Sequence, residues 1–173
     1  YDDFEWVMNI DFWGMVYGTK AFLPQIQKKG AGHIINVSSI FGLISVPSQA
    51  AYNSAKFAIR GFTEALIQEM KGTDIKVSSV HPGGIKTNIV RNARFLQSST
   101  VTEREDAMSG FDQIARTTPE KAAETIVNGI IKNKKRILIG FDARLVDWAQ
   151  RLFPTRYGFM FRRQAEGSGL NLS

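Results

Sequence analysis

The sequence lacks cysteine altogether, which excludes disulfide bonds and thiolate-ligated metal sites. Its two histidines, His33 and His81, are too few and too far apart to indicate a zinc site, so we interpret both as structural. No apolar run is long enough to span a bilayer. The 173 residues are 43% hydrophobic and 22% charged, a globular composition that is sufficient for one domain with a core.

The chain contains short apolar runs and longer segments of helical periodicity, which predict strands and helices respectively. The runs rich in β-branched residues predict buried strands at 33–38, 75–80 and 136–140. The longer segments predict helices at about 3–28, 48–71 and 142–152. Pro24 is expected to kink the first helix or to tighten its last turns, and Gly30 and Gly32 are expected to end it.

Tyr52 and Lys56 are four residues apart in the second predicted helix, so their side chains share one face, a single turn apart. A cation within a few ångströms favours the ionised form of a phenol. A tyrosine in this setting can donate and accept protons near neutral pH. Taken alone, the spacing also fits an aromatic anchor beside a solvated lysine.

Two predicted strand ends carry further polar groups. Ser39 follows the first strand, and a loop then returns to the helix of Tyr52. The second strand leads into Pro82-Gly83-Gly84, a turn with little side-chain bulk, and then to Thr87. Because open α/β sheets bind ligands at the carboxyl ends of their strands, we expect these groups to face one ligand. An ordinary strand-to-loop turn is the alternative for the Pro-Gly-Gly segment.

Together, these motifs resemble those of the short-chain dehydrogenase/reductase family. The matching residues are Asn9, Ser39, Tyr52 with Lys56, and Pro82-Gly83 followed by Thr87. The resemblance covers positions 1–90 in order and spacing and continues more loosely to about 150. It implies a Rossmann-like, doubly wound parallel sheet, with residues 1–163 as the C-terminal part of one domain and 164–173 as a loose tail.

The family resemblance also implies an NAD(P)-dependent oxidoreductase that interconverts an alcohol and a ketone or aldehyde by hydride transfer. Tyr52 would be the general acid or base, Ser39 would hold the substrate oxygen, and Lys56 would assist Tyr52 and bind the cofactor ribose. The carbonyl of Asn9 would hold a water that extends the proton relay to Lys56; a polar residue facing a neighbouring helix is the alternative for Asn9.

The remaining implied contacts concern the cofactor, the substrate and a second subunit. The residues expected to border the nicotinamide of NAD or NADP are Pro82, Gly83, Ile85 and Thr87. Those expected to contact the substrate are Ser39, Ile40 and Tyr52. By the same resemblance, the helices predicted at 3–28 and 48–71 are expected to form a homodimer or homotetramer.

The chain departs from the family because it contains no glycine-rich phosphate-binding turn, and the residue that would distinguish NAD from NADP belongs to the same region. We therefore interpret the sequence as an incomplete Rossmann-type domain without its first strands. An incomplete sheet leaves its first strand exposed along one edge. The chain alone is thus predicted to be insoluble or molten and to lack dehydrogenase activity.

Residues 88–118 follow the nicotinamide-bordering turn and show few strand or strong helix signals, so we interpret them as a substrate lid. A poorly ordered connection is the alternative. The lid contains Phe95, Leu96, Val101, Met108 and Phe111, and the loop after Ser39 is also apolar. Both features favour a bulky, apolar alcohol or ketone as the substrate.

Residues 132–163 contain nine Lys or Arg and two Asp, interleaved with aromatic residues, in a chain of net charge +6. This composition fits a final strand and helix with a solvated face, or attraction to an anionic membrane surface; binding to nucleic acid is least favoured. The expected location is cytoplasmic, with membrane association as an option. Two further function classes stay open: a non-catalytic relative with the same fold, and a peripheral membrane-binding module.

Overall fold

The computed structural model describes residues 1–94 and 101–158 and contains one three-stranded parallel sheet. Its strands are β1 (Ala31–Val37), β2 (Asp74–Pro82) and β3 (Arg136–Ile139), in the order β1-β2-β3. Ala31 pairs with Asp74, and Ser79 pairs with Arg136. The three strands predicted from the apolar runs are confirmed, as is their parallel arrangement.

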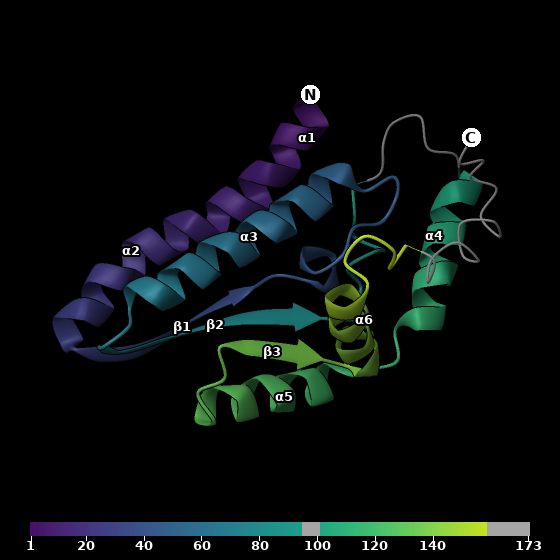
Figure 1. The fold of residues 1–173 in the computed structure, drawn as a ribbon. Coiled ribbons are helices and arrows are strands. Elements are labelled where there is room, and N and C mark those ends of the chain that lie inside the picture. Colours follow the sequence, from purple (N-terminus) through teal and green to yellow (C-terminus); the bar gives the residue numbers. More distant parts are fainter. Residues whose placement is uncertain (95–100, 159–173) are drawn as a thin grey trace.

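Helices cover both faces of this sheet (Figure 1). One face carries α2 (Gly14–Lys29) and α3 (Ala50–Glu69), and the other carries α5 (Pro119–Ile131). The helix α6 (Phe141–Leu152) stands at the carboxyl ends of the strands, with α4 (Val101–Ile114) farther out on the same side. The strand ends that carry predicted site residues, those of β1 and β2, therefore lie at the same edge of the sheet.

The first predicted helix is observed as an uninterrupted helical run that contains a π-helical segment. It consists of α1 (Asp2–Val7), the π-helix η1 (Met8–Trp13) and α2. Pro24 lies inside α2, and the kink that we expected there stays a prediction. The run ends as predicted at Gly30, whose φ of 82° lies in the left-handed region and whose N–H binds the carbonyls of Ile26 and Gln27.

Two helices were not predicted. The helix α5 begins with clear signals, since the Thr118 hydroxyl accepts a hydrogen bond from Lys121 N–H and Pro119 occupies the first turn. The helix α4 lies within the segment in which we expected few helix signals. It escaped prediction because most of its described side chains are exposed, so its sequence lacks the apolar stripe from which a helix is recognised.

The core consists of separate clusters on the two faces of the sheet. Between the sheet and the α2/α3 layer, Ile34, Leu66 and Val77 are buried together. On the opposite face, Val80, Ala122, Ile137 and Ile139 form a second cluster. Burial of each larger side chain stabilises the fold by about 1.5–3 kcal/mol. Of the three strands, β2 contributes to both clusters, through Val77 on one face and Val80 on the other.

The strand β1 forms an outer edge of the sheet in the part of the chain that the structure describes. Val37, at its end, is 52% exposed, although valine is typical of a buried strand. A groove of about 500 Å³ runs between α2 and this edge and is lined by apolar groups such as Phe22 and Ile35. The free edge agrees with the incomplete sheet that we expected. Among the described helices, none combines the length and apolarity needed to cross a bilayer.

Candidate active site

Ser39 lies directly beyond β1 and begins a short 3₁₀ turn, η2 (Ile40–Gly42). Its hydroxyl accepts a hydrogen bond from Phe41 N–H at 3.2 Å, and its carbonyl is held by Nδ1 of His81 at 2.9 Å. Ser39 is buried, and Ile40 beside it is half-buried against the apolar cluster of Leu43 and Ile44. The serine is thus fixed at both its hydroxyl and its carbonyl.

Tyr52 and Lys56 lie one turn apart on α3, as their spacing predicts. The ammonium of Lys56 lies 5.2 Å from the centre of the Tyr52 ring, a cation–π distance. The ring of Phe41 meets the Tyr52 ring edge-on, with 6.1 Å between their centroids. Because Phe41 belongs to the turn that Ser39 begins, this contact places the serine turn against the tyrosine. The structure therefore brings the three predicted catalytic elements to one region.

Asp11, which sequence analysis did not select, is the direct partner of Lys56. Its Oδ1 lies 2.9 Å from Lys56 Nζ, and the lysine side chain is only 11% exposed. Asn9 is exposed instead, and its carbonyl accepts the N–H of Gly14. Residues two apart on a helix point in nearly opposite directions, so only one of the two can face α3. The structure places the side chain of Asp11, and not that of Asn9, at the lysine.

The serine turn and α3 approach each other closely enough to need a residue without a side chain. The hydroxyl of Ser38 donates to the Lys56 carbonyl at 2.8 Å. A Cβ on Gly42 would collide with this hydroxyl and would lie 2.6 Å from the same carbonyl oxygen. Gly42 therefore permits the packing that holds Ser39 beside Tyr52.

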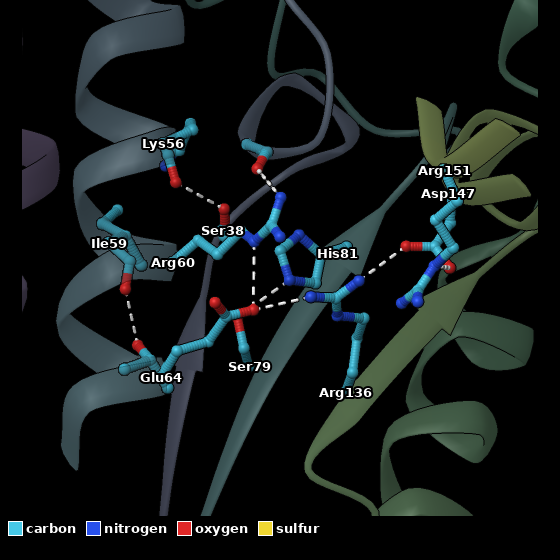
Figure 2. Close-up of polar contacts among 12 residues, drawn as sticks. Ser38, Lys56, Ile59, Arg60, Glu64, Ser79, His81, Arg136, Asp147 and Arg151 are labelled. Atoms are coloured by element: carbon cyan, nitrogen blue, oxygen red, sulfur yellow. Dashed lines mark hydrogen bonds and ion pairs between the residues drawn. The ribbon is translucent and has the colours of Figure 1, made fainter. Parts of the chain in front are cut away.

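A chain of ion pairs anchors α3 to β3 and α6 behind the site (Figure 2). Arg136, on β3, donates to Glu64 at 2.6 Å and to Asp147 at 2.7 Å. Arg60 donates to Glu64 at 3.0 Å and also reaches the carbonyl of Gly42 at 3.3 Å. Burial alone would raise the pKa of Glu64, but the hydrogen bonds from Arg136 and Arg60 outweigh it and lower that pKa. Through the bond from Arg60 to the Gly42 carbonyl, the network thus links the turn after Ser39 to β3 and α6.

His81 is fully buried at the end of β2 and is held in the neutral form. Its Nδ1 must carry the proton, because its partner is the Ser39 carbonyl, and its Nε2 then accepts from the Ser79 hydroxyl at 2.9 Å. Burial lowers its pKa from 6.5 to about 4, against the opposing effect of the bond to Ser39. We interpreted His81 as a structural residue, and the structure shows what it holds, namely the backbone carbonyl of Ser39.

The neutral state of His81 predicts acid sensitivity. Between pH 6.5 and about 4 the unfolded histidine binds a proton and the folded one does not, so stability falls as the pH falls. The gap corresponds to about 3 kcal/mol at ~1.4 kcal/mol per pKa unit. In a complete enzyme that carries these residues, urea unfolding at pH 7, 5.5 and 4.5 should show this loss, and His81→Gln should flatten it.

The matched control is His33→Gln. The pKa of His33 is also lowered, by burial and then by Lys76, so it contributes to the acid loss with the same sign. However, His33 is only partly buried, and we expect its substitution to flatten the curve much less. Equal flattening by both variants would contradict the account of His81.

The Pro82–Gly84 turn is bound on several sides. Gly83 N–H donates to Ile139 O at 2.9 Å, and Gly84 N–H donates to the Asp142 carboxylate at 2.6 Å. Ile85 packs toward the core beside α5, whereas Thr87 is exposed. Thr87 lines a hollow of about 390 Å³, the other lining residues being Lys86, Asn88, Arg91, Asp112 and Ala115. This hollow lies next to the turn expected to border the cofactor.

Among the described residues, no group of three or more potential ligands is arranged to hold a metal ion. The chemistry that these groups offer is proton transfer, from a phenol beside an ammonium, with a hydroxyl on the adjoining turn.

Comparison with known proteins identifies the family. Residues 1–96 match the short chain dehydrogenase family, so the chain belongs to it. A relative named putative oxidoreductase SadH, from Mycobacterium tuberculosis, is 50% identical over 163 residues, which are 91% of this chain and 57% of that protein. The chain thus spans little more than half the length of this relative.

Solved structures share the fold. A short chain dehydrogenase/reductase from Burkholderia phymatum, in complex with NAD, matches 88% of this chain and 58% of its own with a TM-score of 0.75 and 21% identity. A short chain dehydrogenase from Burkholderia cenocepacia, in complex with NADP, matches 96% and 58% with a TM-score of 0.64 and 23% identity. The predicted α/β class with a Rossmann-type parallel sheet is therefore confirmed, here with three strands.

Proposed function

We propose that this chain is the catalytic part of an NAD(P)-dependent oxidoreductase that interconverts an alcohol and a ketone or aldehyde. The observation that carries the proposal is the Tyr52–Lys56 pair at the carboxyl end of a parallel sheet, with the Ser39 turn packed against it. A scaffold without catalysis has no physical need for these three groups together. The bound cofactor supplies or accepts the hydride, and the protein provides position and proton transfer.

In the proposed mechanism, the Tyr52 hydroxyl gives its proton to the carbonyl oxygen during reduction and takes it from the alcohol during oxidation. Ser39 donates a hydrogen bond to the same oxygen and stabilises the charge that develops on it. Lys56 lies beside the phenol, with its ammonium 5.2 Å from the centre of the Tyr52 ring. Each role uses a group that the structure holds in place through the backbone of Ser39 or the rigid helix α3.

Asp11 is proposed to orient Lys56. Its carboxylate holds the ammonium at 2.9 Å, which fixes a long side chain that would otherwise rotate freely. The relay role expected of Asn9 stays a prediction: its carbonyl accepts the N–H of Gly14, and the second lone pair of that oxygen can still accept from a water.

The residues present fit the nicotinamide end of the cofactor. The Lys56 ammonium can donate to ribose hydroxyls, and the bound Pro82–Gly84 turn presents backbone with little side-chain bulk. Ile85 and Thr87 follow that turn, and Thr87 faces a hollow that also contains two basic side chains, Lys86 and Arg91. The support is from this part of the site alone, since the sequence contains no glycine-rich turn for the cofactor phosphates.

Lys56→Ala in a complete enzyme tests this assignment. We expect turnover to fall by at least tenfold and cofactor affinity to weaken by a similar factor, because one ammonium serves both the phenol and the ribose. Kinetics and cofactor titration measure the two effects separately. Lys71→Ala is the matched control, since Lys71 is exposed just beyond the end of α3. A loss of rate with unchanged cofactor affinity would count against the ribose contact.

The substrate is proposed to be a bulky, apolar alcohol or ketone. The apolar loop after Ser39 supports this proposal less than its sequence suggests. Leu43 and Ile44 are fully buried in the core with Val146, which explains the apolar loop without any substrate. The remaining support is from half-buried apolar side chains, Ile40 and Phe41 in the turn after Ser39 and Met108 and Phe111 on α4. Phe95 and Leu96 lie outside the described residues. Higher kcat/KM for lipophilic alcohols than for small polar ones is expected, and the reverse order would exclude this substrate class.

The layer formed by α1, η1, α2 and α3 is proposed to join copies into a homodimer or homotetramer. Large apolar side chains are exposed along it: Phe4, Trp6, Ile10, Trp13, Tyr17, Phe22 and Phe57. Exposed aromatic side chains are typical of protein interfaces. Light scattering of a complete enzyme should give a dimer or tetramer, and a monomer at micromolar concentration would contradict this proposal.

A membrane surface is the second partner that a specific observation favours. On α6, four large apolar side chains lie on one face and are 47–81% exposed: Phe141, Leu145, Trp148 and Leu152. Arg144 and Arg156 are exposed beside them. An exposed apolar stripe flanked by arginines suits insertion at the surface of an anionic bilayer. We propose that α6 makes this contact; the cytoplasmic location stays a prediction.

Among the described residues of this segment, 132–158, the basic side chains do not form one patch, and Arg162 and Arg163 lie outside the described residues. Lys132, Lys134 and Lys135 precede β3 at its amino end, whereas α6 follows β3 at its carboxyl end. Arg136 and Arg151 are paired with carboxylates. Among the described residues, the positive charge near α6 is therefore smaller than the composition of 132–163 suggests. The exposed apolar stripe of α6 is the stronger argument for a membrane contact.

Co-sedimentation with vesicles tests the contact. A complete enzyme should bind vesicles of phosphatidylcholine with phosphatidylserine better than phosphatidylcholine alone, and less at high salt. Trp148→Ser should reduce binding, and Ile131→Ser, which changes an exposed apolar side chain at the end of α5, should not. Equal sedimentation of all three proteins, or self-association through α6 without lipid binding, would overturn the membrane proposal.

A further inference from the structure

Asp142, the second residue of α6, reaches across to the glycine turn at the end of β2. Its Oδ2 accepts the N–H of Gly84 at 2.6 Å, a short hydrogen bond to a charged acceptor. The two residues are 58 positions apart in sequence, so the contact joins the helix to the turn through tertiary structure. A carboxylate at this position does more than complete the first turn of its own helix.

Two glycines leave the space that this carboxylate occupies. A Cβ on Gly83 or on Gly140 would collide with the Asp142 carboxylate, so neither position can hold a side chain without displacing it. Gly140 also has a φ of 96°, in the left-handed region that favours glycine. The bulk-free turn that the sequence offers to a ligand is thus filled on one side by the chain's own carboxylate.

The far side of the turn is closed as well. A Cβ on Gly84 would lie 2.5 Å from the Ile114 carbonyl oxygen, and Thr117 N–H donates to Gly84 O at 3.2 Å. Lys86 N–H in turn donates to Thr117 O at 2.8 Å. Gly84 is therefore hydrogen-bonded on both sides, by Asp142 of α6 and by Thr117 before α5. Loss of either hydrogen bond would give the backbone of the glycine turn more freedom to move.

We infer that Asp142 is a positioning residue for the cofactor: its carboxylate fixes the Pro82–Gly84 turn in the conformation that receives the nicotinamide. The inference rests on the proposed function for the identity of the ligand, but its geometry stands on contacts within the chain. Asp142 itself is not placed against substrate or cofactor. It acts through the backbone of Gly84, and it makes the start of α6 part of the wall that shapes the cofactor site.

The test compares three variants of a complete enzyme. With Asp142→Ala, the dissociation constant and KM of the cofactor should rise on the order of tenfold while kcat changes much less, because the turn must be ordered at the time of binding. Asp142→Asn keeps an acceptor oxygen of the same size and should restore most of the affinity. Glu120→Ala removes a first-turn carboxylate from α5, and it should leave cofactor binding unchanged.

Hydrogen exchange at the Gly84 amide supplies a readout that does not depend on the cofactor. We expect its protection to fall by at least tenfold in Asp142→Ala and to be largely kept in Asp142→Asn. Unchanged protection of the Gly84 amide in Asp142→Ala would overturn the inference. So would a cofactor affinity of Asp142→Ala equal to that of the control Glu120→Ala. A wild-type enzyme that binds neither NAD nor NADP would refute the proposed function instead, while the exchange data would still decide whether Asp142 orders the turn.

Discussion

Tyr52→Phe is expected to abolish turnover in a complete enzyme that carries these residues. The phenol is the group proposed to transfer the proton to or from the reacting oxygen, whereas Ser39 only donates a hydrogen bond to it, so loss of the phenol should cost about 10²- to 10⁴-fold in kcat. The ring of phenylalanine keeps the contacts with Phe41 and Lys56, so the fold of α3 and the position of the lysine should survive. Cofactor affinity should therefore change by no more than a few-fold.

Steady-state kinetics with NAD and NADP, combined with cofactor titration, measures the two effects. Tyr17→Phe is the matched control, because Tyr17 is an exposed phenol on α2 and should have no role in turnover. If the Tyr52→Phe enzyme retains turnover near the wild-type rate, Tyr52 is not the acid or base and the catalytic assignment is wrong.

The second large effect concerns residues 1–173 by themselves. We expect this polypeptide to show no cooperative thermal transition, no binding of NAD or NADP and no dehydrogenase activity. In the part of the chain that the structure describes, no further strand pairs with the outer edge of β1, and an apolar groove lies beside it along α2. Exposed strand edges of this kind favour aggregation, and an apolar surface left in water loses the stabilisation that burial provides.

Calorimetry and cofactor titration on the isolated chain, beside a complete enzyme, provide the comparison. A single cooperative melt of the isolated chain together with cofactor binding would show that the three-stranded sheet is sufficient. That result would contradict our interpretation of the β1 edge as a surface that further structure covers.

Local sequence signals predicted the elements that hold the site. The strands before Ser39 and Pro82 were recognisable because β-branched residues cluster in them, and Tyr52 and Lys56 shared a helix face because four residues make one turn. The start of α5, which we did not predict, also has a local signal in the sequence, because Thr118 is its N-cap and Pro119 lies in its first turn. These features depend on neighbours in sequence, which is why sequence could reveal them.

The missed residues depend on contacts between distant segments. Asp11 faces Lys56 only because of the rotational setting of η1, and no local pattern distinguishes it from Asn9 two residues earlier. Asp142 gains its position from the packing of α6 against the glycine turn, which α6's own sequence does not specify. Similarly, the apolar residues Leu43 and Ile44 could not be divided between core and substrate site until their burial was known.

A crystal structure of the complete enzyme with bound cofactor and a ketone or alcohol is the most direct measurement of the central claim. We expect the Tyr52 and Ser39 hydroxyls both to lie about 2.5–3.0 Å from one substrate oxygen, with the Lys56 ammonium on the ribose. A substrate oxygen bound elsewhere, with Tyr52 packed only against Phe41 and making no polar contact to the ligand, would contradict it.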